Sequence, residues 1–419
     1  MGTPENTLAN TWGVRCLVSS KGTRVVAVSS LCMAVGASVG FLPGFVATAL
    51  QEQLDISMVK VGLLIGVHFG CTGVGSIFSG WICERIGART SVMLDMAIVA
   101  IVAIVSALVA SYWVLFLASV LAGAGYALSN VGTNVAITAV VPISRRTASL
   151  STKTAGVPAM AVVVSAIGPW AANRWGWQLV MGCMGVIAAA AALIALAYLD
   201  DDRPDRGEAP MDHRVPLGFI WFPVGAFLFI GGTQPLFSWT VPFFEQVFDF
   251  SPTLAGTTVS VASCVGVTAM ILNGVFTDRL GPNRRVSHML LLASIALVAG
   301  LFLAISSSVG VWLAAIGLFG GITSQLACVG VLHAALVDRF PHAVARVTGM
   351  MMVGYYIGAL VSPTGFGALV DLTGSYTLSW AAASLLLFLC LPVFKLIERI
   401  PVRHPEACSF DRLSADRKT

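Results

Sequence analysis

Residues 80–89 read GWICERIGAR, and residues 274–285 read GVFTDRLGPNRR. Each stretch begins with a glycine, has an acidic residue and an arginine four and five positions later, and has a second glycine two positions after that arginine. The two copies lie at an offset of 194 residues (274 − 80), and the same offset relates Pro169 to Pro363. An offset that recurs along a chain predicts two related halves.

The composition indicates what surrounds these halves. Of 419 residues, 57% are apolar and only 11% are Asp, Glu, Lys or Arg, whereas about a quarter of a soluble domain is charged. So few charges cannot cover a surface that faces water, which excludes an ordinary cytoplasmic enzyme and a disordered chain. A net charge of only +4 excludes a nucleic-acid-binding protein. The nine cysteines form no C-x-x-C pair, so we expect no disulfide framework, metal site or cofactor.

The apolar residues fall into runs long enough to cross a bilayer, which takes about 20 residues. Twelve runs qualify, at residues 25–49, 58–80, 91–110, 112–141, 148–173, 177–198, 217–241, 252–276, 286–306, 309–337, 346–370 and 376–397. The longest polar connection separates the first six runs from the last six. The predicted fold class is therefore an all-α membrane protein.

The runs and polar stretches divide the chain into five parts. They are an N-terminal segment at 1–24, a six-helix bundle at 25–198, a linker at 199–216, a second six-helix bundle at 217–397 and a tail at 398–419. Lys and Arg gather on the cytoplasmic side of membrane proteins, and with both termini in the cytoplasm only Lys60 and Arg174 fall on the other side. Six crossings return the chain to the same side, so the bundles are predicted to be parallel repeats.

Twelve crossings with this motif after the second and the eighth resemble the major facilitator superfamily. The resemblance implies two six-helix bundles around a central cavity, and a monomeric multi-pass transporter of the inner membrane that moves a small molecule by alternating access. The sequence has no phosphate-binding loop, no dinucleotide fingerprint and no evident nucleophile–base pair, so we expect neither ATP-driven transport nor an enzyme.

The repeated motif is interpreted as a conformational latch between the bundles. The motif lies at one end of each bundle. Its charges can pair with the ends of neighbouring helices only when these two ends of the bundles lie together. Glu84 replaces the usual aspartate and Ala88 replaces a usual basic residue, which predicts a weaker latch in the first half. The alternative is that these charges serve topology and folding only. The latch candidates are Gly80, Glu84, Arg85, Gly87, Arg89, Gly274, Asp278, Arg279, Gly281 and Arg285.

Lys153 is the main candidate for substrate binding. It opens the segment KTAGVP at 153–158, which is loosely similar to a segment of the bacterial porters grouped with cyanate and nitroimidazole transporters. Ionisable groups inside the membrane are costly and mark functional sites, so we expect a cavity cation that meets a small organic anion such as a carboxylate. The alternative is a lysine that reaches toward the membrane surface.

Polar and aromatic residues in other crossings would complete the site. Tyr126, Asn130 and Asn134 are spaced by four and share one face of a helix, where hydrogen bonding between helices explains them as well as substrate contact does. Single candidates in the second half, of types that more often serve packing than recognition, are Gln234, Trp239, Gln325, Tyr355 and Tyr356.

Two further ionisable residues lie inside crossings. His68 titrates near neutral pH in ordinary surroundings, so it is a candidate for proton coupling; the alternative is a neutral histidine bonded to a backbone carbonyl. For Asp95 we expect an ion pair with Arg89 or Arg145.

The predicted function is a secondary active transporter for a small organic anion. One rival is a proton-coupled efflux antiporter for hydrophobic or cationic compounds, and another is a facilitator-like receptor that binds without transport. The expected partners are the lipid bilayer, a small-molecule substrate and, where His68 couples transport, a proton.

Overall fold

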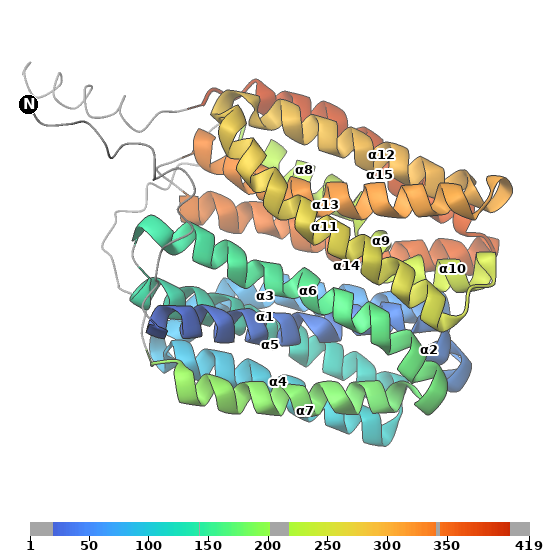
Figure 1. Ribbon diagram of the computed structural model, residues 1–419, viewed down its shortest axis with the longest axis horizontal. Helices are drawn as coiled ribbons and strands as arrows, with labels where there is room; N and C mark the ends of the chain where they lie inside the picture. The colour runs from blue at the N-terminus through green and yellow to red at the C-terminus, as the bar shows by residue number, and fades with distance from the viewer. Residues whose placement is uncertain (1–19, 142, 202–217, 341–343, 403–419) are drawn as a thin grey trace, which may run out of the picture.

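The computed structural model describes residues 20–141, 143–201, 218–340 and 344–402, and none of these forms a strand (Figure 1). The first half contains α1 (Ser20–Phe45), α2 (Ala47–Leu54), α3 (Met58–Ile86), α4 (Ala88–Val109), α5 (Tyr112–Val140), α6 (Ile143–Trp175) and α7 (Trp177–Tyr198). The second half contains α8 (Trp221–Thr233), α9 (Pro235–Ser238), α10 (Thr240–Phe248), α11 (Pro252–Leu280), the 3₁₀ turn η1 (Pro282–Arg284), α12 (Arg285–Val309), α13 (Val311–Arg339), α14 (Val344–Thr373) and α15 (Tyr376–Glu398). Most of the predicted linker at 199–216 and of both terminal segments lies outside the described residues.

Eleven helices in the described part of the chain are long and apolar enough to cross a membrane. The seventh predicted crossing, at 217–241, is the one outside this set of eleven. It is divided into α8, α9 and the start of α10, with interruptions at Gln234 and Trp239. Pro235 and Pro242 have no N–H to continue the helical ladder, which explains the interruption. The first crossing is interrupted in the same way at Val46, three residues after Pro43.

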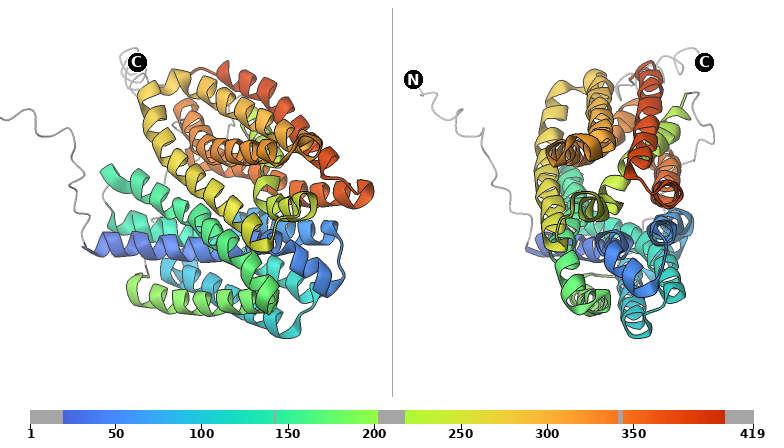
Figure 2. Two further views of the ribbon diagram at one scale, coloured as in Figure 1. Left: turned by 45° about the vertical axis from the view of Figure 1, so that its right-hand side comes forward. Right: turned by 90° about the vertical axis from the view of Figure 1, so that its right-hand side faces the viewer.

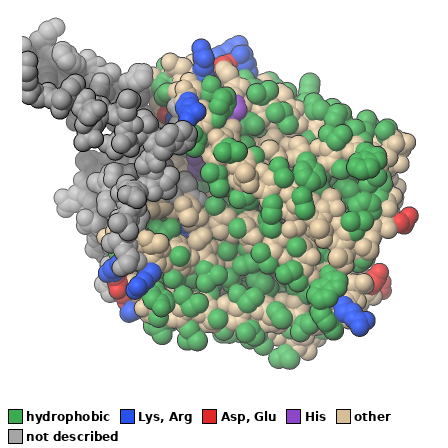
Figure 3. Space-filling model, in the orientation of Figure 1, with side chains coloured by type: hydrophobic (Ala, Val, Ile, Leu, Met, Phe, Trp, Pro, Cys, Tyr) green, Lys and Arg blue, Asp and Glu red, His purple; other side chains and the backbone are tan. Residues whose placement is uncertain are grey.

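The surface of the helices matches a lipid environment. Large apolar side chains such as Leu108, Leu193 and Trp312 are 80%, 68% and 82% exposed. Figure 3 shows such side chains spread over the body of the molecule, with charged side chains gathered toward the ends of the helices. This arrangement buries apolar surface in lipid and leaves the charges at the two membrane surfaces.

The two halves meet through close backbone contacts that obey the sequence repeat. A Cβ atom on Gly62 of α3 would lie 2.3 Å from the carbonyl oxygen of Pro363 on α14. In the equivalent place, a Cβ atom on Gly256 of α11 would lie 2.1 Å from the carbonyl oxygen of Ser165 and 2.8 Å from Pro169 on α6. The offset of 194 (256 − 62) relates these contacts, so the predicted parallel repeat is present in the structure.

A third contact joins the interrupted helices. A Cβ atom on Gly44 of α1 would lie 2.5 Å from the carbonyl oxygen of Ser238 on α9, and these positions also differ by 194 (238 − 44). The three contacts lie toward the end of the molecule that carries α2 and α10, at the right of Figure 1. We call it the closed end.

Toward the opposite end the halves diverge. On α3, Gly73 still meets the side chain of Tyr356 of α14, but Gly80 has nothing within 4 Å of an added Cβ, and neither has Gly349 at the facing end of α14. Gly274 of α11 has equally empty surroundings. The left view of Figure 2 shows α6 and α11 separating in this direction. We call this the open end.

Substitution of Gly62 by alanine is expected to open the closed end. The added methyl group would overlap the Pro363 carbonyl and force α3 away from α14, at a cost of about 1–3 kcal/mol. A cost of this size shifts a two-state equilibrium by about 5- to 150-fold. Glu52 and Gln246 are exposed at the closed end and can carry spin labels. The distance between the two labels, measured by double electron–electron resonance, should therefore become longer. Gly80→Ala is the matched control and should not lengthen it; an unchanged distance in Gly62→Ala would refute the prediction.

Candidate functional site

Lys153 lies on α6 and is only 2% exposed. Its Nζ donates to the side-chain oxygens of Asn130 and Asn134 on α5, at 3.0 and 2.7 Å, and to the backbone oxygen of Asn130 at 3.4 Å. Lys153 of one predicted crossing is thus brought together with the two asparagines predicted to share a face of another. The ammonium group is buried, while Asn134, to which it donates, is exposed.

The local sequence of α6 places this lysine. Gly156 allows α6 to approach α1, since a Cβ atom there would lie 2.6 Å from the backbone oxygen of Ser30. The Ser30 hydroxyl in turn donates to the backbone oxygen of Thr152 at 3.4 Å. This packing directs the side chain of Lys153 toward α5 and into the protein.

Among the described residues, the Nζ atom of Lys153 contacts neutral oxygens. No carboxylate among the described residues forms an ion pair with it. Because Asn130 and Asn134 point their oxygens at Nζ, their NH₂ groups face away from the lysine as hydrogen-bond donors. A buried charge without a counter-ion is costly, and the surrounding donors favour an anionic partner.

The second half contributes tyrosines to the same region. Tyr356 on α14 lies beside the side chain of Asn130, and its ring is 5.5 Å from that of Tyr355. Tyr126, one turn before Asn130 on α5, is close enough to both tyrosines to interact with them electrostatically. These contacts connect the two halves at the level where α3 and α14 begin to diverge.

His68 of α3 is buried beside this region. Its ring lies 6.0 Å from that of Tyr126 and 5.3 Å from that of Phe69. Neither ring nitrogen has a hydrogen-bond partner in the described part of the chain, so the backbone carbonyl expected by the alternative interpretation is not found. The role of His68 in proton coupling stays a prediction.

The ion pair predicted for Asp95 is not formed with Arg89. Arg89 lies in the first turn of α4 and pairs with Asp201 at 3.8 Å, whereas Asp95 is two turns deeper, fully buried between α1 and α5. The side chain of Arg145 is outside the described residues. The spacing of charges along the chain was misleading because α4 presents these two positions to different surroundings.

The remaining candidates lie on the second half. Gln234 and Gln325 are 3% and 4% exposed, and the Gln234 nitrogen and the Gln325 oxygen have no hydrogen-bond partner among the described residues. Trp239 is fully buried, stacks on Phe366 and donates to the backbone oxygen of Pro363 at 3.0 Å. Trp239 therefore has a packing role at the closed end, and its role in substrate binding stays a prediction.

Sequence reasoning missed an aromatic layer between the two halves. Phe41 of α1 lies 5.3 Å from Phe69 of α3 and 6.0 Å from Phe237 of α9, measured between ring centres. Phe41 also packs against the small cluster of Met33, Ala37 and Tyr126. Three isolated phenylalanines in apolar runs carry no periodic signal, so only the tertiary arrangement reveals them.

A carboxylate that caps a helix across the halves was also missed. Asp371 of α14 accepts hydrogen bonds from the backbone N–H groups of Met58 and Val59, at 3.0 and 2.7 Å. These N–H groups begin α3 and have no partner within that helix. Beside them, Thr48 of α2 donates to Glu245 of α10. Both interactions hold the closed end together.

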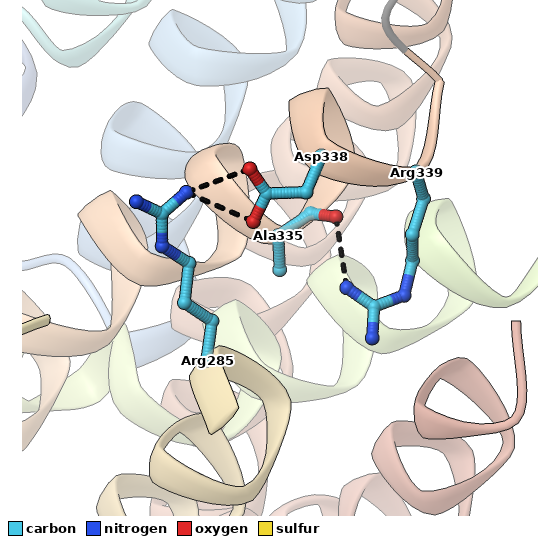
Figure 4. Close-up of polar contacts among 4 residues, drawn as sticks. All are labelled: Arg285, Ala335, Asp338 and Arg339. Carbon is cyan, nitrogen blue, oxygen red and sulfur yellow. Dashed lines mark hydrogen bonds and ion pairs between the residues drawn. The ribbon is translucent and has the colours of Figure 1, made fainter. Parts of the chain in front are cut away.

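Two of the latch candidates, Arg85 and Arg285, make contacts within their own halves in this conformation. Arg85 lies over the ring of Trp81 at 3.7 Å, and Arg285 donates to both carboxylate oxygens of Asp338 at 2.8 Å (Figure 4). Gly87 and Gly281 end α3 and α11 with φ of 85° and 75°, which glycine adopts without strain. Glu84 is half-buried, Arg279 is exposed, and the side chain of Asp278 is outside the described residues. The latch between halves stays a prediction.

Comparisons with known proteins identify relatives that are transporters. The chain is 23% identical to a gentisate transporter of Corynebacterium glutamicum over 58% of both chains. It is 22% identical to a probable sugar efflux transporter of Helicobacter acinonychis, over 64% of this chain and 69% of the relative. It is 24% identical to a cis,cis-muconate transport protein of Acinetobacter baylyi, over 31% of this chain and 32% of the relative. The chain thus spans little more than half the length of the gentisate transporter that it matches.

Solved structures share the fold at low sequence identity. A bacterial homologue of the human lysosomal transporter Spinster, in an inward-facing and occupied conformation, gives a TM-score of 0.76 at 16% identity, over 92% of this chain and 99% of that one. A D-xylose–proton symporter gives 0.75 at 13% identity, over 92% of this chain and all of that one. A sequence profile matches residues 26–330, and with the repeat and the helix arrangement it shows that the chain belongs to the Major Facilitator Superfamily.

Proposed function

We propose that this transporter moves a small organic anion of the carboxylate class by alternating access, as a secondary active transporter of the inner membrane. The observation that carries the proposal is the buried ammonium group of Lys153, which is held by Asn130 and Asn134 and has no counter-ion among the described residues. A bound carboxylate would supply the missing negative charge. Charge-assisted hydrogen bonds of this kind are stronger than neutral ones.

The surrounding groups can bind a carboxylate whose remaining part is polar or aromatic. The NH₂ groups of Asn130 and Asn134 can donate to carboxylate oxygens, while Tyr355 and Tyr356 offer aromatic surface from the second half. The unbonded amide atoms of Gln234 and Gln325 can bind a further polar group. We propose these residues, with Tyr126 and Trp239, as the substrate-binding set.

The names of the relatives support an anionic substrate and also indicate a second candidate for the substrate class. Two of the three relatives take their names from carboxylates, gentisate and cis,cis-muconate. The third is named as a probable sugar efflux transporter, so a neutral hydroxylated solute bound by the same amides is the alternative. The two candidates differ in one respect, because only the anion requires the charge of Lys153.

The geometry supports a cycle in which the two ends close alternately. We propose that the N- and C-termini lie in the cytoplasm, so that the open end faces inward and the closed end faces outward. Opening the outer side breaks the contacts of Gly62 and Gly256 and the cap made by Asp371. The latch residues that follow α3 and α11 would then close the inner side. A bound substrate shifts the balance between the two states only if its affinity for them differs.

Replacement of Lys153 by methionine is expected to abolish anion binding. The variant keeps the volume of the side chain but removes its charge, and loss of one hydrogen-bonded charge from a buried pair costs about 2–5 kcal/mol, or at least about 30-fold in affinity. The measurement is ligand-induced thermal stabilisation of the detergent-purified protein with aromatic and unsaturated carboxylates, neutral sugars and lipophilic cations. Wild-type protein should be stabilised by a carboxylate only.

Lys60→Met is the matched control, since Lys60 is exposed at the start of α3, over the ring of Tyr112. It should bind the same carboxylate as the wild type. Equal stabilisation of wild type and Lys153→Met by a sugar would favour the neutral-solute candidate. Equal stabilisation of both by a lipophilic cation would favour an efflux antiporter.

Replacement of Asp371 by alanine is expected to loosen the start of α3. The loss of a helix cap costs about 1 kcal/mol, which corresponds to about a fivefold change in a local opening equilibrium. Hydrogen exchange measured by mass spectrometry should therefore become faster at the backbone amides of Met58 and Val59.

Asp249→Asn serves as the control at the closed end, because Asp249 is exposed and its left-handed backbone accommodates asparagine. It should leave the exchange of residues 58 and 59 unchanged. If Asp371→Ala also leaves it unchanged, the cap does not hold the closed end.

A further inference from the structure

Asp95 occupies a space that is built for its carboxyl group. It is fully buried in α4, and a Cβ atom on Gly36 of α1 would lie 2.9 Å from one carboxyl oxygen. A Cβ atom on Gly125 of α5 would lie 2.8 Å from the other oxygen. Any side chain at these two positions would displace the carboxyl group, so both glycines are needed to accommodate it.

No cation among the residues whose side chains are described forms an ion pair with this acid. Its oxygens have no hydrogen bond of ordinary geometry in the described part of the chain, although the hydroxyl of Ser129 faces it. An ionised carboxylate without a partner inside a membrane protein is far costlier than a neutral carboxyl group. The geometry therefore favours a protonated Asp95 in this conformation.

The other titratable groups that the structure describes around α4 are neutral or distant from Asp95. Cys32 faces it from α1 and Tyr126 faces it from α5. From α3, His68 reaches this region through its contact with Tyr126. On α7 the titratable side chains are Cys183 and Tyr198, and both are exposed on the outside of the helix. On α4 itself, Arg89 is paired with Asp201.

We propose that Asp95 binds the proton that is transported together with the anion. This proposal rests on the proposed function and names its coupling ion. A proton adds to the carboxylate to form the carboxylic acid and leaves it again, and no other bond forms or breaks. In the present conformation the proton is enclosed, because no part of Asp95 is exposed.

A direct structural connection links Asp95 to Lys153. Tyr126 contacts the surroundings of Asp95, and Asn130, which holds Lys153, lies one turn further along α5. Tyr126 and Asn130 also interact with tyrosines of α14 in the other half. A movement of α14 relative to α5 therefore changes the surroundings of both charged groups together, which is what coupling requires.

The pairing of one acid, Asp95, with one base, Lys153, leads to a specific prediction about the net charge that is transported. A monovalent anion at Lys153 and one proton at Asp95 together carry no net charge. Accumulation of the anion should therefore follow a pH gradient and should not respond to membrane potential alone. This separates Asp95-linked transport from uptake driven by voltage.

The test uses full-length protein in liposomes with an anion that stabilises the wild type. Asp95→Asn keeps the shape of the neutral carboxyl group but cannot release a proton. It should retain counterflow exchange, which needs no net proton movement, and should lose accumulation driven by a pH gradient. Asp55→Asn is the matched control and should keep both activities, since Asp55 is exposed and its left-handed backbone accommodates asparagine.

Infrared difference spectroscopy of the purified protein provides an independent readout. The wild type and Asp55→Asn should show the band of a buried protonated carboxyl group at neutral pH, and Asp95→Asn should lack it. Equal pH-driven accumulation in wild type and Asp95→Asn, or no such band in the wild type, would overturn the proposal. Failure of the proposed function looks different, because the wild type would then show no counterflow with any anion.

Discussion

The approach of α3 to α14 and of α11 to α6 at the closed end is the constraint on which the rest of the structure depends. Gly62 and Gly256 have no side chain, so a helix of one half can lie directly on the backbone of the other. In lipid there is little hydrophobic force to hold helices together, and close packing of small residues takes its place. These contacts fix one end of the molecule and leave the other end free to separate.

The position of the proposed binding region follows from this constraint. The halves stay in contact as far as Gly73 and Tyr356, and they separate beyond that level. Tyr356 also lies beside Asn130, which forms a cluster with Asn134 and Lys153. The cluster therefore lies where the contact between halves ends, and any change in how the halves meet changes the surroundings of Lys153.

The sequence predicted the helices well and the contacts between halves poorly. The run at 112–141 became α5 (Tyr112–Val140), because bilayer thickness fixes the length of an apolar helix. The spacing of four between Asn130 and Asn134 correctly predicted a shared face, and the structure shows Lys153 bound to it. In contrast, Asp371 caps a helix that begins more than 300 residues earlier in the chain, and no local pattern indicates such a pairing.

The two ends of α3 are placed so that only one of them can lie against the other half at a time. Gly62 and Gly80 lie on the same helix and are separated by about 27 Å at 1.5 Å per residue. A helix that is rigid over this distance and lies against α14 at Gly62 is held away from the other half at Gly80. Rocking about the intervening contact would bring Gly80 and the charged motif toward the other half as Gly62 leaves it. The repeat gives α11 the same pair of positions, Gly256 and Gly274. The contact of α3 with α14 and the contact of α11 with α6 would therefore change together.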